Sequence, residues 1–257
     1  MTRAIAMLAL TVTATAGTRI PVSATAVPPA QDAPLRPHTI HTVRLTSTAY
    51  GVVRTFGLLL PRDYDRTTRR YPVLYLLHGS TQQHSTWGRP TLLDHTAGAI
   101  VVMPDMDRTR YALADGSPER AAERFITSEL VDYIDAHYRT VATRDARAIG
   151  GLSIGGFGAM YLGLRHPDAF AAVGAFSAPF ETGGDPMTWL PVEQLRAAPL
   201  RIYVGCGVED ALLASSRRFS AWLQAHGIDR TYDEGPGAHT WDAWDWQLGT
   251  FLRMLKW

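Results

Sequence analysis

The pattern of apolar and polar positions divides the chain into an N-terminal hairpin and a longer part in which strands and helices alternate. Apolar residues alternate with polar ones, in part, over 41–47 and 52–60, and Ala49, Tyr50 and Gly51 separate the two stretches. A period of two is typical of a strand with one buried face. We therefore expect an antiparallel hairpin at the start of the fold.

Short apolar runs with little alternation follow the hairpin. They cover residues 73–77, 99–103, 146–149, 170–176 and 200–204. Runs of this kind are typical of parallel strands that are buried on both faces. Segments with apolar residues at helical spacing lie between or after them, at 118–138, 157–165, 211–226 and 240–255.

Strands that alternate with helices predict an α/β protein, in which helices cover both faces of a mainly parallel sheet. We find no internal repeat and no second domain boundary, so one domain over residues 39–257 is expected. In such sheets the functional residues gather in the loops beyond the carboxyl ends of the strands.

The first residues have the pattern of an export signal. Arg3 precedes a mostly apolar stretch of small residues over 4–16, and Ala26 offers a small residue for cleavage. We predict a signal peptide over residues 1–26, a linker over 27–38 and a secreted, extracellular protein. The apolar stretch is too short and too rich in threonine for a spanning helix, so no stable membrane insertion is expected after cleavage.

Composition narrows the classes of partner. The 257 residues include 25 Lys and Arg against 24 Asp and Glu, without a basic cluster, so nucleic acid is not an expected partner. The single cysteine, Cys206, ends an apolar run, and a small buried strand residue explains it more simply than a reactive thiol. The motifs below imply no metal ion and no cofactor.

The strongest local signal is the sequence Gly-Leu-Ser-Ile-Gly at 151–155, between a predicted strand and a predicted helix. In that context G-x-S-x-G is a nucleophile elbow, with Ser153 as the nucleophile. The turn is so tight that a Cβ on either side of the serine would clash, which is why glycines stand at 151 and 155. The helix that follows contributes backbone N–H groups and a positive dipole end near a developing oxyanion. A glycine-rich turn without chemistry is the alternative, and the strand–turn–helix context argues against it.

A nucleophilic serine needs a base, and His239 is the candidate among nine histidines. It lies in a glycine-rich loop, after a short strand-like stretch and before the last predicted helix. Asp210, which follows the run at 200–204, would orient the imidazole, and the chain order Ser, Asp, His is the one that α/β-hydrolases use. Glu209 is the rival acid, because a single residue decides which side chain turns inward.

An oxyanion hole requires two hydrogen-bond donors. The backbone N–H of Ile154, the residue after the nucleophile, is the first candidate. The second should come from the loop after the run at 73–77, where Gly79 lets the backbone approach closely. We assign it to the N–H of Ser80, with Thr81 as the alternative.

The motifs recur as a set along most of the chain. They lie at residues 70–79, 102–105, 125–130 with 133–135, 151–156, 207–210 and 237–241 with 244. From about residue 40 onward the chain resembles the putative-esterase (esterase D-like) family of α/β-hydrolases. That family includes feruloyl and acetyl xylan esterases, enterochelin esterases, S-formylglutathione hydrolases and mycolyltransferases. The resemblance implies the α/β-hydrolase fold and the same triad, Ser153, Asp210 and His239.

We therefore expect a secreted serine carboxylesterase that acts through an acyl-enzyme on a small-molecule or carbohydrate ester, such as a carbohydrate-linked acyl or feruloyl ester. An acyltransferase of the mycolyltransferase type would have the same triad, so the motifs leave it open, and a non-catalytic binding module is a third alternative. Candidate substrate contacts are Trp87, Asp105, Trp189 and Trp241, although large aromatic side chains near loops more often serve packing. Neither the ester nor the oligomeric state follows from the sequence.

Overall fold

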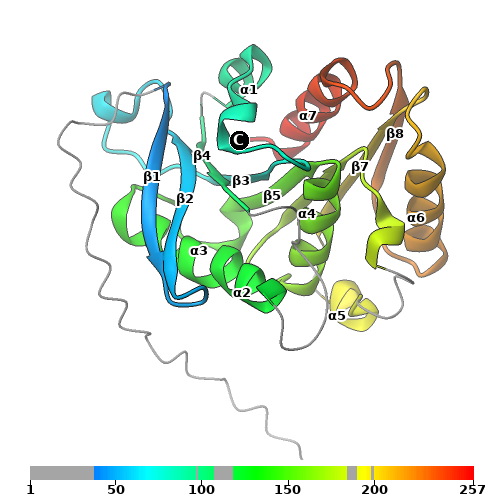
Figure 1. The fold of residues 1–257 in the computed structure, drawn as a ribbon, viewed down its shortest axis with the longest axis horizontal. Helices are drawn as coiled ribbons and strands as arrows, with labels where there is room; N and C mark the ends of the chain where they lie inside the picture. The colour runs from blue at the N-terminus through cyan, green and yellow to red at the C-terminus, as the bar shows by residue number, and fades with distance from the viewer. Residues whose placement is uncertain (1–37, 97, 107–117, 184–189, 198–199) are drawn as a thin grey trace, which may run out of the picture.

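The computed structural model describes residues 38–96, 98–106, 118–183, 190–197 and 200–257. Within these residues, eight strands form one sheet in the order β1-β2-β4-β3-β5-β6-β7-β8, and helices cover both of its faces (Figure 1). The predicted signal peptide and its linker lie outside the described part, apart from the last linker residue. The expected α/β architecture is confirmed.

The hairpin predicted from the alternating pattern forms one end of this sheet. β1 (Ile40–Ser47) pairs antiparallel with β2 (Val52–Leu59), and Val43 lies opposite Phe56 in the register. Both of these side chains are buried, as expected for the apolar face of the hairpin. β2 pairs antiparallel with β4 (Ile100–Pro104), which joins the hairpin to the main sheet.

The remaining strands run parallel to one another. They are β3 (Val73–Leu77), β4, β5 (Arg147–Leu152), β6 (Ala172–Phe176), β7 (Arg201–Gly207) and β8 (Thr231–Gly235). β5 continues through Gly150, where the apolar run ends. A Cβ on Gly150 would lie 3.1 Å from the ring of Phe251, so glycine lets the last helix, α7 (Trp241–Leu255), pack closely on the strand.

The predicted helices are present, and the first is divided. It consists of α2 (Pro118–Arg124), a π-helical turn η4 (Phe125–Glu129) and α3 (Leu130–His137). The others are α4 (Ile154–Arg165), α6 (Leu213–Ala225) and α7. The pattern misses α1 (Pro90–His95) and α5 (Val192–Ala197), because six residues are too few to show a helical period. Short 3-10 turns lie at η1 (Tyr64–Arg66), η2 (His84–Trp87), η5 (Arg144–Ala146) and η6 (Phe180–Gly183).

The apolar core has two layers, one on each face of the sheet. In the first, side chains of α3, α4 and α6, such as Phe157 and Phe219, pack against the strands. In the second, side chains of α7, such as Leu248 and Phe251, cover the opposite face together with α1. Because the strands from β3 to β8 run parallel, their carboxyl ends lie at one edge of the sheet, where the loops with the candidate residues begin.

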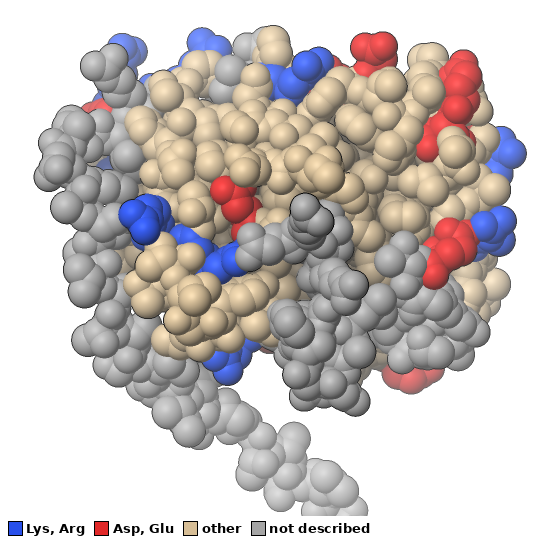
Figure 2. Space-filling view, in the orientation of Figure 1, with Lys and Arg blue, Asp and Glu red and all other residues tan. Residues whose placement is uncertain are grey.

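Cys206 is buried within β7, as the simpler interpretation of the sequence predicts, and burial raises the pKa of its thiol. Among the described residues, no helix combines the length and the apolar character that crossing a membrane requires. On the face seen in Figure 2, Lys and Arg side chains form small separate groups on a surface of mostly uncharged residues, so the visible described surface has no continuous basic area.

Candidate active site

Ser153 occupies a strained turn between β5 and α4. Its backbone angles are φ 53° and ψ −127°, a combination that non-glycine residues rarely adopt. Such strain costs about 1–3 kcal/mol and persists only where surrounding contacts enforce it. Here the Ser153 N–H donates to Phe176 O of β6 at 2.8 Å, and Ser153 O accepts from Gly156 N at 2.9 Å.

The two glycines of the motif are required by close backbone contacts. A Cβ on Gly151 would lie 2.4 Å from Gly155 O, and a Cβ on Gly155 would lie 2.2 Å from Leu77 O. Both distances are far below van der Waals contact, and the obstructing atoms belong to the backbone. The turn can therefore close, and the first turn of α4 can rest on the end of β3, only when glycine stands at both positions.

His239 lies between Ser153 and Asp210 and forms hydrogen bonds with both. Its Nε2 is 2.9 Å from Ser153 Oγ, and its Nδ1 is 2.8 Å from Asp210 Oδ2. Because an ionised carboxylate only accepts, Nδ1 carries the proton and Nε2 accepts from the serine hydroxyl. The His239 side chain is 37 % exposed and that of Asp210 is 0 % exposed, so the base can be reached while its partner is sealed from water.

Asp210 and Glu209 have separate partners around the His239 loop. Asp210 Oδ1 accepts from Leu212 N at 2.8 Å, which leaves Oδ2 for the imidazole. Glu209 Oε2 accepts from Gly237 N at 2.5 Å. The structure thus brings Asp210 to His239, and it places Glu209 on the loop that carries the histidine.

The loop after β3 packs against the turn that carries Ser153. A Cβ on Gly79 would lie 2.8 Å from Leu152 Cδ1, so glycine permits this approach. Ser80 follows and is exposed. Ile154 is the first residue of α4, and its N–H has no acceptor within the helix. The positions of Ser80 and Ile154 suit two oxyanion donors, and the role of their backbone N–H groups stays a prediction.

The candidate substrate contacts differ in accessibility. Trp241 is half-buried and lies edge-on to Trp244 at 5.5 Å between ring centroids, and Trp244 lies edge-on to His239 at 5.0 Å. Trp87 is 0 % exposed and packs edge-on against Trp241 at 5.7 Å, so packing accounts for it. Trp189 lies outside the described residues.

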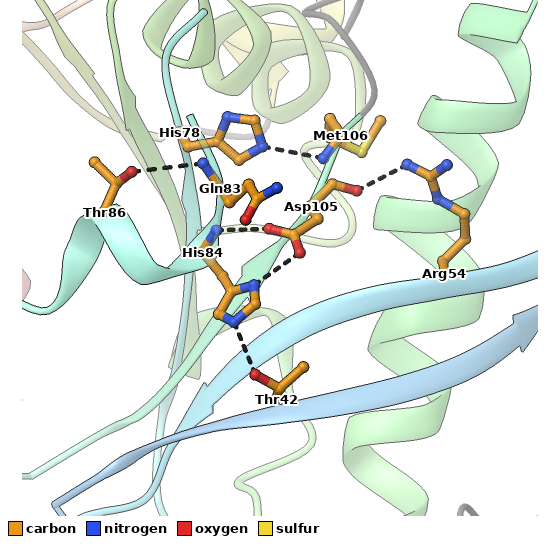
Figure 3. A network of polar contacts seen from close by, with 8 residues as sticks. All are labelled: Thr42, Arg54, His78, Gln83, His84, Thr86, Asp105 and Met106. Carbon is orange, nitrogen blue, oxygen red and sulfur yellow. Dashed lines mark hydrogen bonds and ion pairs between the residues drawn. The ribbon is translucent and has the colours of Figure 1, made fainter. Parts of the chain in front are cut away.

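Asp105 is engaged by a histidine that the sequence patterns do not single out. Asp105 Oδ1 accepts from the backbone N–H of His84 at 2.6 Å, and Oδ2 lies 2.7 Å from His84 Nδ1 (Figure 3). Thr42 of β1 lies 3.0 Å from His84 Nε2. Burial alone would raise the pKa of the Asp105 carboxyl, but the hydrogen bonds from His84 lower it below its usual range. These residues come from three separate segments, so no local motif could have revealed the cluster.

Within the described residues, no group of three or more His, Cys, Asp or Glu side chains is arranged to hold a metal ion. The polar groups at the sheet edge instead form a chain from hydroxyl through imidazole to carboxylate. Such a chain can make a serine hydroxyl nucleophilic at neutral pH.

Known proteins are similar to this chain in sequence and in fold. A family model described as "Putative esterase" matches residues 47–255. An esterase of Mycobacterium tuberculosis is 36% identical over 143 residues, which are 53% of this chain and 31% of that protein, so the chain spans about a third of this relative's length. An acetyl esterase of Caldicellulosiruptor saccharolyticus is 25% identical over 218 residues, 70% of this chain and 82% of that protein.

A solved structure of a ferulic acid esterase superposes with a TM-score of 0.70 at 26% identity, over 85% of this chain and 97% of the other. The resemblance expected from the motifs is confirmed, and so is the α/β-hydrolase fold. The family model covers most of the described residues, including the edge of the sheet where Ser153, Asp210 and His239 meet. The chain therefore belongs to the putative esterase family.

Proposed function

We propose that this protein is a serine carboxylesterase, with Ser153 as nucleophile, His239 as general base and Asp210 as the acid that orients it. The observation that carries the proposal is the continuous hydrogen-bonded chain, 2.9 Å from Ser153 to His239 and 2.8 Å from His239 to Asp210. Membership of an esterase family supports ester hydrolysis as the reaction.

Each group has a defined part in the reaction. Ser153 Oγ attacks the ester carbonyl carbon while His239 Nε2 takes the hydroxyl proton, and the buried Asp210 carboxylate stabilises the imidazolium that results. The backbone N–H groups of Ser80 and Ile154 stabilise the oxyanion, each contributing about 3–4 kcal/mol to the transition state. His239 then gives its proton to the leaving alcohol. Water, deprotonated by His239, attacks the acyl carbon of the acyl-enzyme. The bond from that carbon to Ser153 Oγ then breaks, and His239 returns the proton to Ser153 Oγ as the acid is released.

The proposed substrate is an acylated or feruloylated carbohydrate outside the cell. Support comes from the printed names of two relatives, an acetyl esterase and a ferulic acid esterase. Secretion rests on the sequence pattern of residues 1–26. The half-buried Trp241 lies two aromatic contacts from the base through Trp244, and we take it as the candidate contact for an aromatic or sugar ring.

Product analysis tests the reaction. The mature protein is incubated with an aryl acetate, an acetylated xylo-oligosaccharide and a feruloylated arabinose, each with and without glycerol or trehalose. Release of free acid, unaffected by the alcohol and absent in Ser153→Ala, is the expected result. Acylated alcohol as the main product would replace the esterase with an acyltransferase, and equal turnover by Ser153→Ala would remove Ser153 from its role.

A further inference from the structure

His78 is a buried histidine directly after β3 that takes no part in the triad. Only 1 % of it is exposed. Its Nδ1 lies 2.8 Å from Gly79 O, and its Nε2 lies 3.0 Å from the backbone nitrogen of Met106. Figure 3 shows the ring beside the segment that follows β4, with its Nε2 directed at Met106.

These two contacts determine the tautomer. The backbone N–H of Met106 can only donate, so His78 Nε2 must accept and carries no proton. The proton of the neutral ring is then on Nδ1 and is donated to Gly79 O. One neutral tautomer satisfies both bonds, whereas an imidazolium would direct a second N–H against that of Met106. Burial lowers the pKa of His78 and so favours this neutral form, although the bond to Gly79 opposes the shift.

The hydrogen bond from His78 to Gly79 O orients the whole peptide unit between Gly79 and Ser80, including the N–H of Ser80. No peptide bond in the described residues is cis, so the N–H of Ser80 points opposite to the carbonyl of Gly79 in the same planar unit. Gly79 O also accepts from Gln82 N at 3.3 Å, and Gly79 N donates to Gln82 Oε1 at 2.9 Å. Whatever orients the Gly79 carbonyl therefore also orients the N–H of Ser80.

The loop needs such a restraint, because residues 78–83 lie between β3 and η2 and belong to no helix or strand. Its far end is tied by His84 to Asp105, and its near end by His78 to Met106. Two consecutive residues after β4 thus hold both ends of the loop.

We propose that His78 is a positioning residue for the oxyanion hole, which holds the Gly79–Ser80 peptide so that the Ser80 N–H faces the reacting carbonyl. The inference rests on the proposed function, in which that N–H stabilises the oxyanion. The competing explanation is a buried histidine that only fills space. The hydrogen bond to Gly79 O and the hydrogen bond from Met106 N can be removed separately by substitution.

Asparagine and glutamine each retain one half of the imidazole. In His78→Asn, the amide nitrogen stands near the place of Nδ1 and can still donate to Gly79 O, while the bond from Met106 is lost. In His78→Gln, the amide oxygen stands near the place of Nε2 and can still accept from Met106, while the bond to Gly79 is lost. The matched control is His137→Gln, because His137 Nδ1 also donates to a backbone carbonyl, that of Tyr133 at 2.8 Å, within α3.

The experiment measures kcat, KM and Tm with an aryl acetate for the wild type, both His78 variants, His137→Gln and Ser153→Ala. Removing an oxyanion donor lowers kcat by about 10²–10³. We expect His78→Gln to lower kcat by about 10–100-fold with little change in KM, within that upper limit. We expect His78→Asn to stay within about fivefold of the wild type, and His137→Gln to match it.

Equal losses of kcat in the Asn and Gln variants, in step with losses of Tm, would overturn the proposal and leave a packing role. Wild-type kcat in a folded His78→Gln, with turnover still dependent on Ser153, would overturn it as well and leave the esterase intact. A wild type without Ser153-dependent turnover would remove the proposed function and this inference together.

A second measurement does not depend on any variant folding. The ¹⁵N shifts of labelled histidines in the wild type report which ring nitrogen is protonated. The proposal requires a proton on Nδ1 of His78 and none on Nε2, and the opposite tautomer would contradict it.

Discussion

Glu209 and Asp210 are neighbours in the chain, yet their carboxylates bind different parts of one loop. Asp210 Oδ2 lies 2.8 Å from Nδ1 of His239. Glu209 Oε2 lies 2.5 Å from the backbone nitrogen of Gly237, which is two residues before His239 in the chain. One carboxylate therefore contacts the base, and the other holds the backbone that carries the base.

This division predicts unequal effects of removing each charge. Asp210→Asn should lower kcat by about 10⁴, since the amide favours the wrong imidazole tautomer. Glu209→Gln keeps an oxygen that can accept from Gly237 N, so we expect kcat within about tenfold of the wild type. Steady-state kinetics of both variants on one aryl ester give the ranking, and the reverse order would transfer the acid role to Glu209.

The strained backbone of Ser153 predicts a trade between stability and activity. Ser153→Ala and Ser153→Gly should both lose turnover by about 10⁶, as in other triads. Glycine tolerates φ 53° without a Cβ penalty, so the strain of about 1–3 kcal/mol should be relieved only in the glycine variant. Thermal unfolding should show a higher Tm for Ser153→Gly than for Ser153→Ala, and a lower one would mean that the turn stores no strain.

The close approach of α4 to β3 predicts that Gly155 tolerates no side chain. In Gly155→Ala, the new Cβ would lie 2.2 Å from Leu77 O, so the backbone must shift and we expect a loss of at least about 3 kcal/mol of unfolding free energy. Gly249→Ala in α7 is the matched control. Its Cβ would meet only Arg253 Nη1, at 3.4 Å, and alanine favours the helix by about 0.5–1 kcal/mol. Denaturant unfolding of the two variants should move the midpoints in opposite directions.

The buried neutral His78 predicts a loss of stability in mild acid. Its pKa in the folded protein lies below 6.5, the value for an exposed histidine, so between the two values the unfolded chain binds more protons. The unfolding free energy from this group is therefore fully present above about pH 6.5 and is lost as the pH falls toward the folded pKa. Tm should fall less between pH 7 and pH 5 in His78→Asn than in the wild type, and parallel curves would contradict the assignment.

Much of the fold could be predicted because strands and long helices leave periodic signals. The apolar run that ends before His78 became β3, and the run before Gly150 became the first half of β5. The pattern at 118–138 predicts one helix, but the structure inserts the π-turn at Phe125–Glu129, where Glu129 accepts from Ser47 Oγ at 2.6 Å. That contact spans 82 positions, and a periodic signal carries no information about such a distance.

The candidate site, like the fold, has residues that local sequence predicts and residues that it does not. Ser153 and His239 stand in recognisable local contexts, at a strand–turn–helix and before a final helix. The choice between Asp210 and Glu209 depended on which side chain turns inward, and only three-dimensional contacts decide that. No local pattern singles out His84, because its partner Asp105 is 21 positions away in the chain.

The two apolar layers described above have a consequence for how the enzyme would fail. Ser153 directly precedes α4, whose side chains belong to one layer, and His239 precedes α7, whose side chains belong to the other. The 2.9 Å between the two residues therefore exists only while both layers are closed on the sheet. Ester turnover would thus report whether both layers of the core are folded. Heat inactivation should coincide with global unfolding, and no active state should exist in which one layer has unfolded.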